Sequence, residues 1–517
     1  ACGKRSLHSH KRVIDAVLQD THSIQGVARE RPLADSRETA LLDRRAFYID
    51  GSWIVPESRD VAHIVNPSTE QPFAVISMGT EEDVNAAVAA AEHAFHSFGR
   101  TSKSERLQLL GRLLAAMERR VDDFAQVISQ QIGAPITLAR ETHTKAVGIN
   151  RLKEAIAALD RFREEGETTH SGRTRLFRQP IGVCGLITPW NWPINQVAQK
   201  LFPALAVGCT VVLKPSTLSP LDSMILAECA EEAGYPKGVF NLINGSGALI
   251  GDALARHPSV RMVSLTGSTR AGVSLMKSAA DTVKRVALEL GGKSPNIVFD
   301  DADVDAAVEW GVRRVMTNSG QTCTAPTRML VQQGVYDQAV NTAKRVCDSI
   351  KVGNPSEEGG HIGPVVSAAQ YETIQKYIAL GIREGARLVA GGLGRPEPFN
   401  CGFYVRPTVF AEVDNKMTIA QEAIFGPVLV IRPFKDEAEA IAIANDSPYG
   451  LAGYIQTADP VKAARVAMAL EAGVISINTQ VQGVEAPFGG TKLSGNGREG
   501  STWGLEEYTE LKSVTGL

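Results

Sequence analysis

The chain has 517 residues, of which 44% are hydrophobic and 21% charged, the composition of an ordinary globular protein. This length exceeds what one core normally organises, so two or three domains are expected. The formal net charge of −3 argues against an electrostatic nucleic-acid binder and gives no reason to expect a membrane surface as a partner. No apolar run approaches the length of a transmembrane helix.

Cysteine and histidine are used sparingly. The chain has seven cysteines, an odd number, and no pair has the spacing of metal ligands, so neither a disulfide framework nor a metal site is predicted. A reducing compartment fits this usage best, and we expect the protein in the cytoplasm. Import into an organelle stays open, because residues 1–14 carry four basic side chains and no acidic one.

The N-terminal part divides into an extension and packed helices. Residues 1–46 are polar and weakly periodic, and they are predicted to form an extension. Thr80 precedes a helical pattern, and Ser102 with Glu105 forms a capping box. The apolar positions that follow this box run as far as Phe124, which predicts one second helix.

Beyond Arg178 short apolar runs alternate with turns and helical patterns. Such units predict parallel strands in an α/β fold of the doubly wound type, with ligands at the carboxyl ends of the strands. A second α/β stretch begins near Gly291, and the tail 506–517 alternates like a strand that pairs outside its own domain. The predicted strand segments are 182–187, 210–213, 239–243 and 261–265, followed by 387–392, 424–434 and 473–478.

Three turns of the first α/β stretch contain polar groups that suit a ligand. Two prolines stiffen the turn around Asn191, whose amide can then serve an oxyanion; the alternative is an Asn that bonds its own backbone. Lys214 ends an apolar strand and can reach a ribose or phosphate, unless it is a surface lysine. Gly267 and Ser268 lie at a strand-to-helix turn, where free N–H groups favour a diphosphate.

A base and a nucleophile complete the set of reactive groups. Glu289 lies in an apolar strand, where burial raises its pKa toward that of a useful base; the alternative is a buried pair with Lys293. Cys323 lies in the polar turn of NSGQTCTAPTR, and a thiolate there can attack a carbonyl carbon. The other cysteines within apolar runs are expected to be inert, namely Cys184, Cys209 and Cys229.

From about Phe47 to Leu517 the chain resembles the aldehyde dehydrogenase superfamily of NAD(P)-dependent, non-acylating enzymes. The resemblance rests on PWNWP, LKPS, TGST, LELGGK, GQTC, IFGPV and APFGG, in the family's order and spacing. It implies a Rossmann-type cofactor domain, an α/β catalytic domain and a small oligomerisation arm in a homodimer or homotetramer. The implied boundaries are 47–157 and 181–291 for the cofactor domain, 292–491 for the catalytic domain, and 158–180 with 492–517 for the arm.

The resemblance also implies a reaction, the oxidation of an aldehyde to a carboxylic acid with NAD or NADP. In that reaction Cys323 attacks the aldehyde, Asn191 and the Cys323 N–H hold the oxyanion, and Glu289 activates the water that hydrolyses the thioester. The implied cofactor contacts are Ile187, Thr188, Pro189, Trp190, Lys214, Thr217, Gly247, Gly251, Thr266, Gly267, Ser268, Leu290 and Phe425. The candidate substrate residues are Asn195, Gln196, Gln199, Thr317 and Thr322, and they predict an uncharged pocket for a small or polar aldehyde.

Two positions depart from the family pattern. Thr217 stands where the family usually has a glutamate, and a threonine does not repel a 2′-phosphate, so NADP is admissible beside a slightly preferred NAD. Ala423 stands where the glutamate that holds the nicotinamide ribose is usual, and Glu422, one residue away, is expected to point elsewhere. A weaker or more mobile cofactor is therefore predicted.

Two other functions remain open on the sequence. One is a non-catalytic structural or binding relative, which Ala423 favours and which the presence of Cys323, Glu289 and Asn191 disfavours. The other is a cofactor-independent thioesterase or esterase that uses the same cysteine and glutamate. Reduction of nicotinamide separates the main hypothesis from both alternatives.

Overall fold

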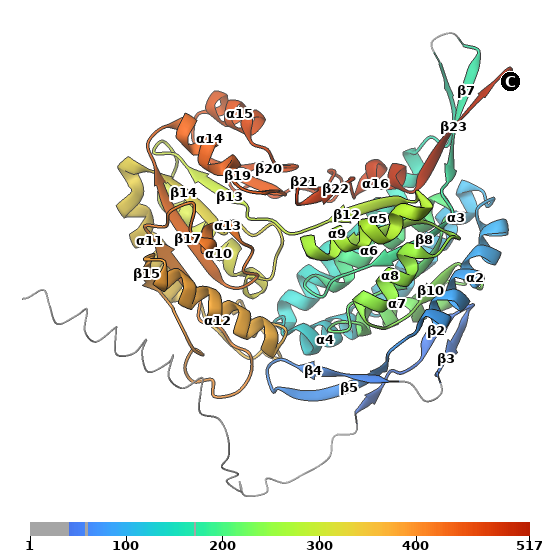
Figure 1. Cartoon of the computed structure of the whole chain (residues 1–517), viewed down its shortest axis with the longest axis horizontal. Coiled ribbons are helices and arrows are strands. Elements are labelled where there is room, and N and C mark those ends of the chain that lie inside the picture. The colour runs from blue at the N-terminus through green and yellow to red at the C-terminus, as the bar shows by residue number, and fades with distance from the viewer. Residues whose placement is uncertain (1–40, 57–59, 170–171) are drawn as a thin grey trace, which may run out of the picture. The chain divides into compact units, whose positions relative to one another are not determined.

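The computed structural model describes residues 41–56, 60–169 and 172–517, which form five β-sheets with their covering helices (Figure 1). The predicted extension therefore lies outside the described residues apart from 41–46. In the described ranges no helix is long and apolar enough to cross a membrane. A three-stranded sheet near the N-terminus contains β1 (Leu42–Asp43), β5 (Gln71–Ser77) and β4 (Val61–Asn66).

The helices that follow confirm both predicted helix starts. One of the two predicted helices, however, is shorter than expected. Asp83 and Glu105 complete capping boxes at the starts of α2 and α3. The single second helix that we predicted is wrong, because the backbone of Arg120 leaves helical geometry and closes one helix while opening the next. The helices of this region are α2 (Glu81–Phe98), α3 (Lys103–Arg119), α4 (Val121–Ile132), the π-helical η2 (Leu138–Ile149) and α5 (Asn150–Arg161).

The larger sheet has eight strands, and the four segments predicted in the first α/β stretch all contribute to it. Its inner strands β12, β11, β8, β9 and β10 are parallel, and β22, β2 and β3 join antiparallel at the edges. In spatial order the strands are β22 (Gly495–Asn496), β12 (Arg285–Glu289), β11 (Val260–Thr266), β8 (Val183–Ile187), β9 (Thr210–Lys214), β10 (Phe240–Leu242), β2 (Phe47–Ile49) and β3 (Ser52–Ile54).

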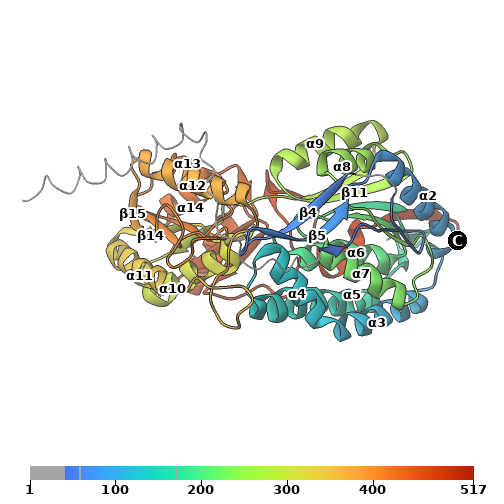
Figure 2. The ribbon, with the colours of Figure 1, turned by 90° about the horizontal axis from the view of Figure 1, so that it is seen from below.

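Helices cover both faces of this sheet, as the doubly wound prediction requires. Figure 2 shows α3 to α7 on one face and α2, α8 and α9 on the other, and a separate hydrophobic cluster lies under each group. The order of the strands reverses between β8 and β11, which is the point where open α/β sheets bind ligands. The helices not yet given are α6 (Pro193–Val207), α7 (Leu221–Glu232), α8 (Gly247–Arg256) and α9 (Thr269–Ala279), with η3 (Ala280–Thr282) after α9.

A second sheet of seven strands follows, and its strands are parallel except for β15 at one edge. Its order is β15 (Arg387–Ala390), β16 (Thr408–Ala411), β17 (Val428–Phe434), β14 (Arg328–Gln332), β13 (Pro295–Val298), β19 (Ala452–Gln456) and β20 (Val474–Ile477). Its helices are α10 (Val304–Met316), α11 (Tyr336–Ser349), α12 (Ala368–Arg383), α13 (Thr418–Gln421), α14 (Glu437–Asn445) and α15 (Pro460–Ala469), with short η4 (Thr317–Gly320) and η5 (Gln333–Val335).

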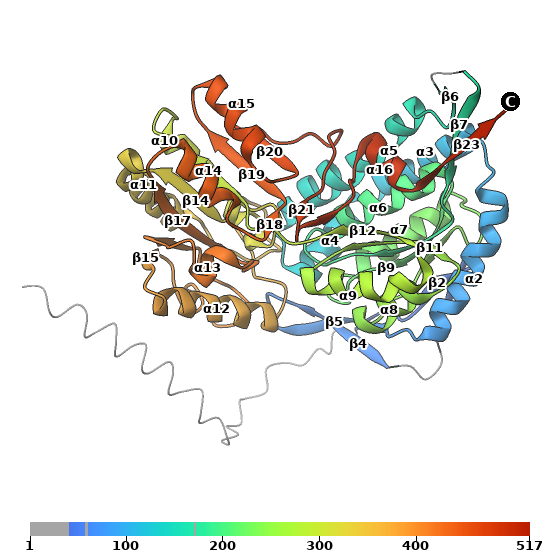
Figure 3. The same cartoon turned by 45° about the horizontal axis from the view of Figure 1, so that its top comes forward.

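The C-terminal segment returns to the first sheet. A two-stranded sheet, β18 (Tyr449–Gly450) with β21 (Thr491–Lys492), lies between the two large sheets in Figure 3. The predicted tail strand is confirmed as β23 (Thr509–Thr515), which starts late because Ser501–Glu507 forms helix α16. This strand pairs antiparallel with β7 (Thr174–Pro180), and β6 (Glu165–Thr168) completes that small sheet.

Candidate active site

The strand register of the larger sheet brings the predicted turns to one edge. Ile187 pairs with both Lys214 and Leu265, and Thr266 pairs with Glu289, so the carboxyl ends of β9, β8, β11 and β12 coincide. The residues that follow these ends include the turn of Asn191, the LKPS segment and the first turn of α9. The doubly wound fold therefore places the predicted oxyanion donor, cofactor turns and base on one side.

Cys323 reaches this edge from the second sheet. It lies in the loop between η4 and β14, while the chain from β12 crosses directly through Gly291–Gly292 into β13. A Cβ at Gly292 would lie 2.8 Å from the Cys323 carbonyl oxygen, and a Cβ at Gly320 would lie 2.0 Å from that of Gly426. Only glycine allows these close approaches, so three loops at the amino ends of β13, β14 and β17 pack backbone against backbone.

The turn that presents Asn191, the predicted oxyanion donor, is tied to the cysteine loop by two amides. Asn191 Nδ2 donates to the Gln321 carbonyl oxygen over 3.1 Å, and Asn318 Nδ2 donates to the Asn191 carbonyl oxygen over 2.8 Å. Asn191 is buried, and its side chain bonds a residue far away in sequence, so the alternative in which it bonds its own backbone is wrong. One N–H of the Asn191 amide remains for a ligand beside Cys323.

A buried histidine supports the same turn, and the sequence analysis missed it. The His143 ring stacks on Trp192 at 4.1 Å between centroids, and Trp192 Nε1 donates to Thr322 Oγ1 over 3.1 Å. Burial lowers the pKa of His143 to about 3, so the ring is neutral at working pH. The stack therefore holds Trp192, and through it the residue that precedes Cys323. Its only sequence signal is a lone histidine in a helical segment.

A cavity of about 550 Å³ joins the thiol to the dinucleotide turns. Cys323 and Asn191 line it together with residues at the start of α9. Trp190 and Phe425 meet edge to face at 6.2 Å across its wall. The predicted site residues that line this cavity are Pro189, Trp190, Asn191, Gln196, Thr266, Gly267, Ser268, Leu290, Cys323 and Phe425.

The thiol of Cys323 is not a free thiolate in this environment. Burial raises its pKa to about 12, and the charge of Glu289 adds to this effect. The backbone N–H groups of Cys323 and Thr324 oppose it by stabilising the thiolate. A base is therefore needed to take the proton at neutral pH. By contrast Cys184, Cys209 and Cys229 are fully buried, as expected for inert thiols.

Glu289 is the buried carboxyl that the sequence predicted. It is 4% exposed, neither oxygen has a hydrogen-bond partner among the described residues, and burial raises its pKa above the ordinary value. The predicted alternative, a pair with Lys293, is wrong, because the Lys293 ammonium also has no hydrogen-bond partner in this part of the chain. Such an unpaired carboxyl is costly to keep unless it is used.

A lysine–glutamate pair that sequence reasoning missed lies beside Glu289. Lys200 Nζ contacts Glu499 Oε1 at 2.5 Å and donates to Ser264 Oγ over 3.0 Å. Glu289 and Glu499 share the lining of a small cavity of about 10 Å³, close to the least that one water occupies. The charge of Glu499 raises the pKa of Glu289 further, and that of Lys200 lowers it. A lysine inside the apolar helix α6 was the available signal.

The groups at the other strand ends fit a dinucleotide. The Lys214 ammonium is buried, which excludes a surface lysine, and it donates to the Pro215 carbonyl oxygen over 2.8 Å. Burial lowers its pKa to about 8. A Cβ added at Gly247 would meet nothing within 4 Å, so the start of α8 is open, and the buried Thr266 hydroxyl has no partner within the described ranges. Open helix N-termini beside a cation and an unpaired hydroxyl suit phosphates and polar ligand groups.

The remaining predicted residues do not line the cavity of Cys323. Gln199 lines the 10 Å³ cavity with Glu289, and Gly251 packs against the Ile187 side chain at 3.5 Å from an added Cβ. Thr317 lines a separate cleft of about 840 Å³ and is not brought to the thiol. The side-chain oxygens of Asn195 and Gln199 are buried without a partner in the region that the structure describes. Thr188, Thr217 and Thr322 do not line the cavity of Cys323.

The two positions beside Phe425 behave as their spacing predicted. Ala423 lines the cavity of Cys323, and Glu422 turns to Tyr377, whose hydroxyl donates to Glu422 Oε2 over 2.6 Å. Phe425 itself has a left-handed φ of 55°, which the bond between its carbonyl and Gln370 Nε2 (2.9 Å) helps to hold.

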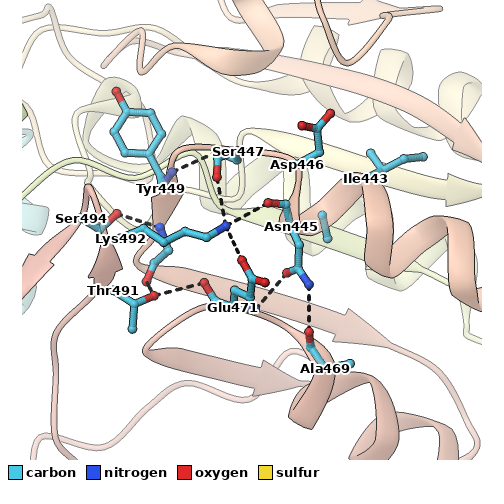
Figure 4. A network of polar contacts seen from close by, with 12 residues as sticks. Ile443, Asn445, Asp446, Ser447, Tyr449, Ala469, Glu471, Thr491, Lys492 and Ser494 are labelled. Carbon is cyan, nitrogen blue, oxygen red and sulfur yellow. Dashed lines mark hydrogen bonds and ion pairs between the residues drawn. The ribbon is translucent and has the colours of Figure 1, made fainter.

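A polar network anchors the connection between the two sheets (Figure 4). Lys492 Nζ donates to the carbonyl oxygens of Asn445 and Ser447 and forms an ion pair with Glu471 at 2.5 Å. Ser494 Oγ accepts from Gly450 N and donates to the Gly291 carbonyl oxygen over 2.7 Å. The network thus fixes the segment after Glu289, while the Tyr449 ring projects away from it in Figure 4.

No group of three or more His, Cys, Asp or Glu side chains able to hold a metal ion is present in residues 41–56, 60–169 and 172–517. The arrangement instead offers a thiol and an amide donor on one cavity, and a buried carboxyl whose charge acts on the thiol. These three groups suit attack on a carbonyl carbon, stabilisation of the oxyanion and hydrolysis of an acyl-cysteine.

Comparison with known proteins agrees with this chemistry. The family model described as "Aldehyde dehydrogenase family" matches residues 53–514. The chain is 48% identical over 474 residues to a 3-succinoylsemialdehyde-pyridine dehydrogenase of a Pseudomonas species, with 92% of this chain and 99% of that protein covered. A putative aldehyde dehydrogenase of Staphylococcus saprophyticus is 45% identical, with 91% and 98% covered.

Solved structures give the same result. An aldehyde dehydrogenase from Bartonella henselae has a TM-score of 0.90 and 47% identity, with 92% of this chain and 100% of that chain covered. Aldehyde dehydrogenase C from Pseudomonas syringae, a mutant complexed with NAD+ and octanal, has a TM-score of 0.89 and 45% identity, with 93% and 98% covered.

The packing at Gly320 predicts that Gly320→Ala is destabilising. The new methyl group would meet the Gly426 carbonyl oxygen, and the φ of 75° is left-handed, so we expect a loss of at least about 2 kcal/mol in the free energy of unfolding. Gly334→Ala is the matched control, because nothing lies within 4 Å of its added Cβ. Urea unfolding of both variants measures the difference, and equal midpoints would contradict this account of the loop packing.

Proposed function

Since the chain belongs to the aldehyde dehydrogenase family, we propose that it oxidises a polar, uncharged aldehyde to the carboxylic acid, with Cys323 as the nucleophile. Oxidation of an aldehyde is the activity of the family. The observation that carries the assignment of residues is the pair of amide bonds that holds Asn191 against the Cys323 loop. This pair of bonds supports Asn191 as an oxyanion donor for Cys323, which is the only thiol that lines the 550 Å³ cavity within the described ranges.

In the first half of the reaction Cys323 gives its proton to Glu289, whose raised pKa lets it hold the proton. The thiolate sulfur then forms a bond to the aldehyde carbon, and the carbonyl π-electrons become an oxyanion. The free Asn191 N–H and the Cys323 N–H bind that oxyanion. A nicotinamide bound in this cavity would supply the acceptor for the hydride that leaves the same carbon, and a thioester on Cys323 would remain.

Glu289 must first release the proton that it took from Cys323, and in the second half it then acts as a base toward water. Water adds to the thioester carbon, its proton goes to Glu289, and the C–S bond breaks to return the thiolate and release the acid. The proton from water then returns from Glu289 to the Cys323 thiolate, whereas the first proton needs a way out of a buried site before hydrolysis begins. Glu499 borders the same small cavity as Glu289, and Lys200 contacts Glu499, so this pair is our proposed exit for the proton.

The strand-end residues support a role in binding the cofactor. We assign Lys214 to the adenosine ribose, and the N–H groups of Gly247 at the start of α8 and of Ser268 before α9 to the diphosphate. The Gly267 N–H instead donates to the Glu289 carbonyl oxygen over 3.0 Å, and Gly251 lies inside α8. The related enzyme of Pseudomonas syringae was crystallised with NAD+, which supports NAD. Thr217 carries no charge that would repel a 2′-phosphate, so NADP remains a second acceptor.

The substrate end supports a polar aldehyde. Gln196 lines the cavity of Cys323, whereas Asn195 and Gln199 do not line it. An amide on the cavity wall favours a substrate that can bond to it over a hydrocarbon chain. The name of the Pseudomonas relative indicates a semialdehyde attached to a pyridine, which is a polar aldehyde.

One charged side chain near this end escaped the sequence analysis. Arg151 shares a small cavity with Gln199, and its Nη1 donates to the Val484 carbonyl oxygen over 2.8 Å. Burial lowers the pKa of Arg151, and the charges of Glu499, Glu154 and Glu485 oppose this shift. Because these acids balance the guanidinium, we keep the proposal of an uncharged substrate.

We also propose an oligomeric state and a cellular location. A homodimer or homotetramer follows from the family and from the strand pair β7–β23. The cytoplasm remains the proposed location, since the cysteines of the described ranges are free.

The proposed function predicts cysteine-dependent reduction of the coenzyme. The purified protein should increase absorbance of reduced nicotinamide with hydroxylated, keto or amino aldehydes, at a kcat/KM at least about 10-fold above that for octanal. Cys323→Ala should abolish the signal with an unchanged unfolding midpoint, and Cys401→Ala is the matched control.

Three outcomes would contradict this prediction. Activity in Cys323→Ala would remove the cysteine from the mechanism. Hydrolysis of an ester with no reduction of coenzyme would favour the esterase alternative. Silence toward every aldehyde, in a protein that binds NAD, would favour a non-catalytic relative.

The Thr217 position predicts a shift in coenzyme preference. Thr217→Glu adds a carboxylate that repels a 2′-phosphate, so the ratio of kcat/KM for NAD over NADP should rise by at least about 10-fold. Thr217→Gln, similar in shape but uncharged, serves as the control and should change the ratio far less. A ratio that stays constant in the glutamate variant would refute the role given to Thr217.

A further inference from the structure

One wall of the cavity around Cys323 comes from helix α12, which the sequence analysis did not use. Gln370, Thr373 and Tyr377 lie three and four residues apart, so they share one face of the helix, and all three line the cavity. The proposed function requires the ribose next to the nicotinamide to lie between Cys323 and the start of α9. The α12 face borders the same space.

The polar groups of this wall are largely occupied. Gln370 Nε2 donates to the carbonyl oxygens of Ile424 and Phe425 over 3.0 and 2.9 Å, and Thr373 Oγ1 donates to that of Ala369 over 2.8 Å. Ala423 adds only a methyl group. The wall therefore needs another group with a fixed direction if it is to hold a ribose hydroxyl.

Tyr377 supplies such a group. Its hydroxyl donates to Glu422 Oε2 over 2.6 Å, so its proton points to Glu422 and its oxygen lone pairs remain free. Burial and the Glu422 carboxylate both raise the pKa of Tyr377, so the phenol stays protonated. A phenol that donates to a carboxylate is polarised and becomes a better acceptor.

We propose that the Tyr377 hydroxyl accepts a hydrogen bond from a hydroxyl of the nicotinamide ribose, with Glu422 orienting and polarising it from the side away from the cavity. Glu422 is a positioning residue in this arrangement, because it acts through Tyr377. The pair does indirectly what a carboxylate at position 423 would do by direct contact. The inference rests on the proposed function, since it assumes a dinucleotide in this cavity.

The test compares two ligands by calorimetry without any turnover. ADP-ribose contains the ribose in question, whereas ADP lacks it. Tyr377→Phe should raise the Kd of ADP-ribose by about five-fold and leave that of ADP unchanged, because one hydrogen bond is lost. Glu422→Gln should raise the Kd of ADP-ribose by a smaller factor.

Two further variants sharpen the result. Tyr371→Phe is the matched control: it lies on the same helix, and its ring contacts Arg395 instead of the cavity, so neither Kd should change. Ala423→Glu in the Tyr377→Phe background places a carboxylate on the cavity wall and should restore the binding of ADP-ribose.

The outcomes are distinct. If Tyr377→Phe changes neither Kd, the inference is overturned. Equal weakening of ADP and ADP-ribose would show a structural role for Tyr377 and would overturn it as well. If the wild-type protein binds neither ligand, the proposed function itself fails, and this inference fails with it.

Discussion

The site depends on two amide side chains that hold one turn of the first sheet against the cysteine loop of the second. Asn318 donates to the backbone of Asn191, and Asn191 donates to the backbone of Gln321, two residues before Cys323. Both amides are buried, where a lost bond would leave an unpaired polar group at a cost of about 1–3 kcal/mol. The distance between the thiol and the oxyanion donor is therefore set by the fold before a substrate arrives.

This constraint explains why the loops around Cys323 have unusual backbones. Asn318, Ser319 and Gly320 are successive left-handed residues, with φ of 53°, 55° and 75°, and only the last is a glycine. Such a run costs energy that the surrounding bonds must offset. The bonds of Asn318 to the oxyanion turn and of Ser319 to the Gly363 carbonyl oxygen do so. The same geometry lets Gly320 pass close to Gly426 beside Phe425, so the cysteine loop and the cofactor wall form one packed unit.

Much of this arrangement could be predicted from the sequence, because parallel strands align their carboxyl ends. From the sequence alone, that rule places Asn191, Lys214 and the turn of Gly267 at one edge. The approach of the Cys323 loop to that edge could not be predicted. Cys323 precedes β14 and lies at the amino end of that strand, whereas the rule concerns carboxyl ends. Contacts such as Lys200 with Glu499 join residues 299 apart, and no local pattern encodes them. The proposed role of Tyr377 could not be predicted either, because it depends on a bond to Glu422, which lies outside helix α12.

The most direct test of the central claim is a rapid-mixing measurement of reduced nicotinamide with the Glu289→Gln variant. If Cys323 forms the thioester and Glu289 activates the hydrolytic water, each active subunit should release about one equivalent of reduced coenzyme and then stall, because an amide is a poor base. This release should be slower than in the wild-type protein, because Glu289 also takes the proton of the thiol. Mass spectrometry should then find the acyl group on Cys323. Steady turnover at the wild-type rate, or a stalled protein without an acylated cysteine, would contradict the account.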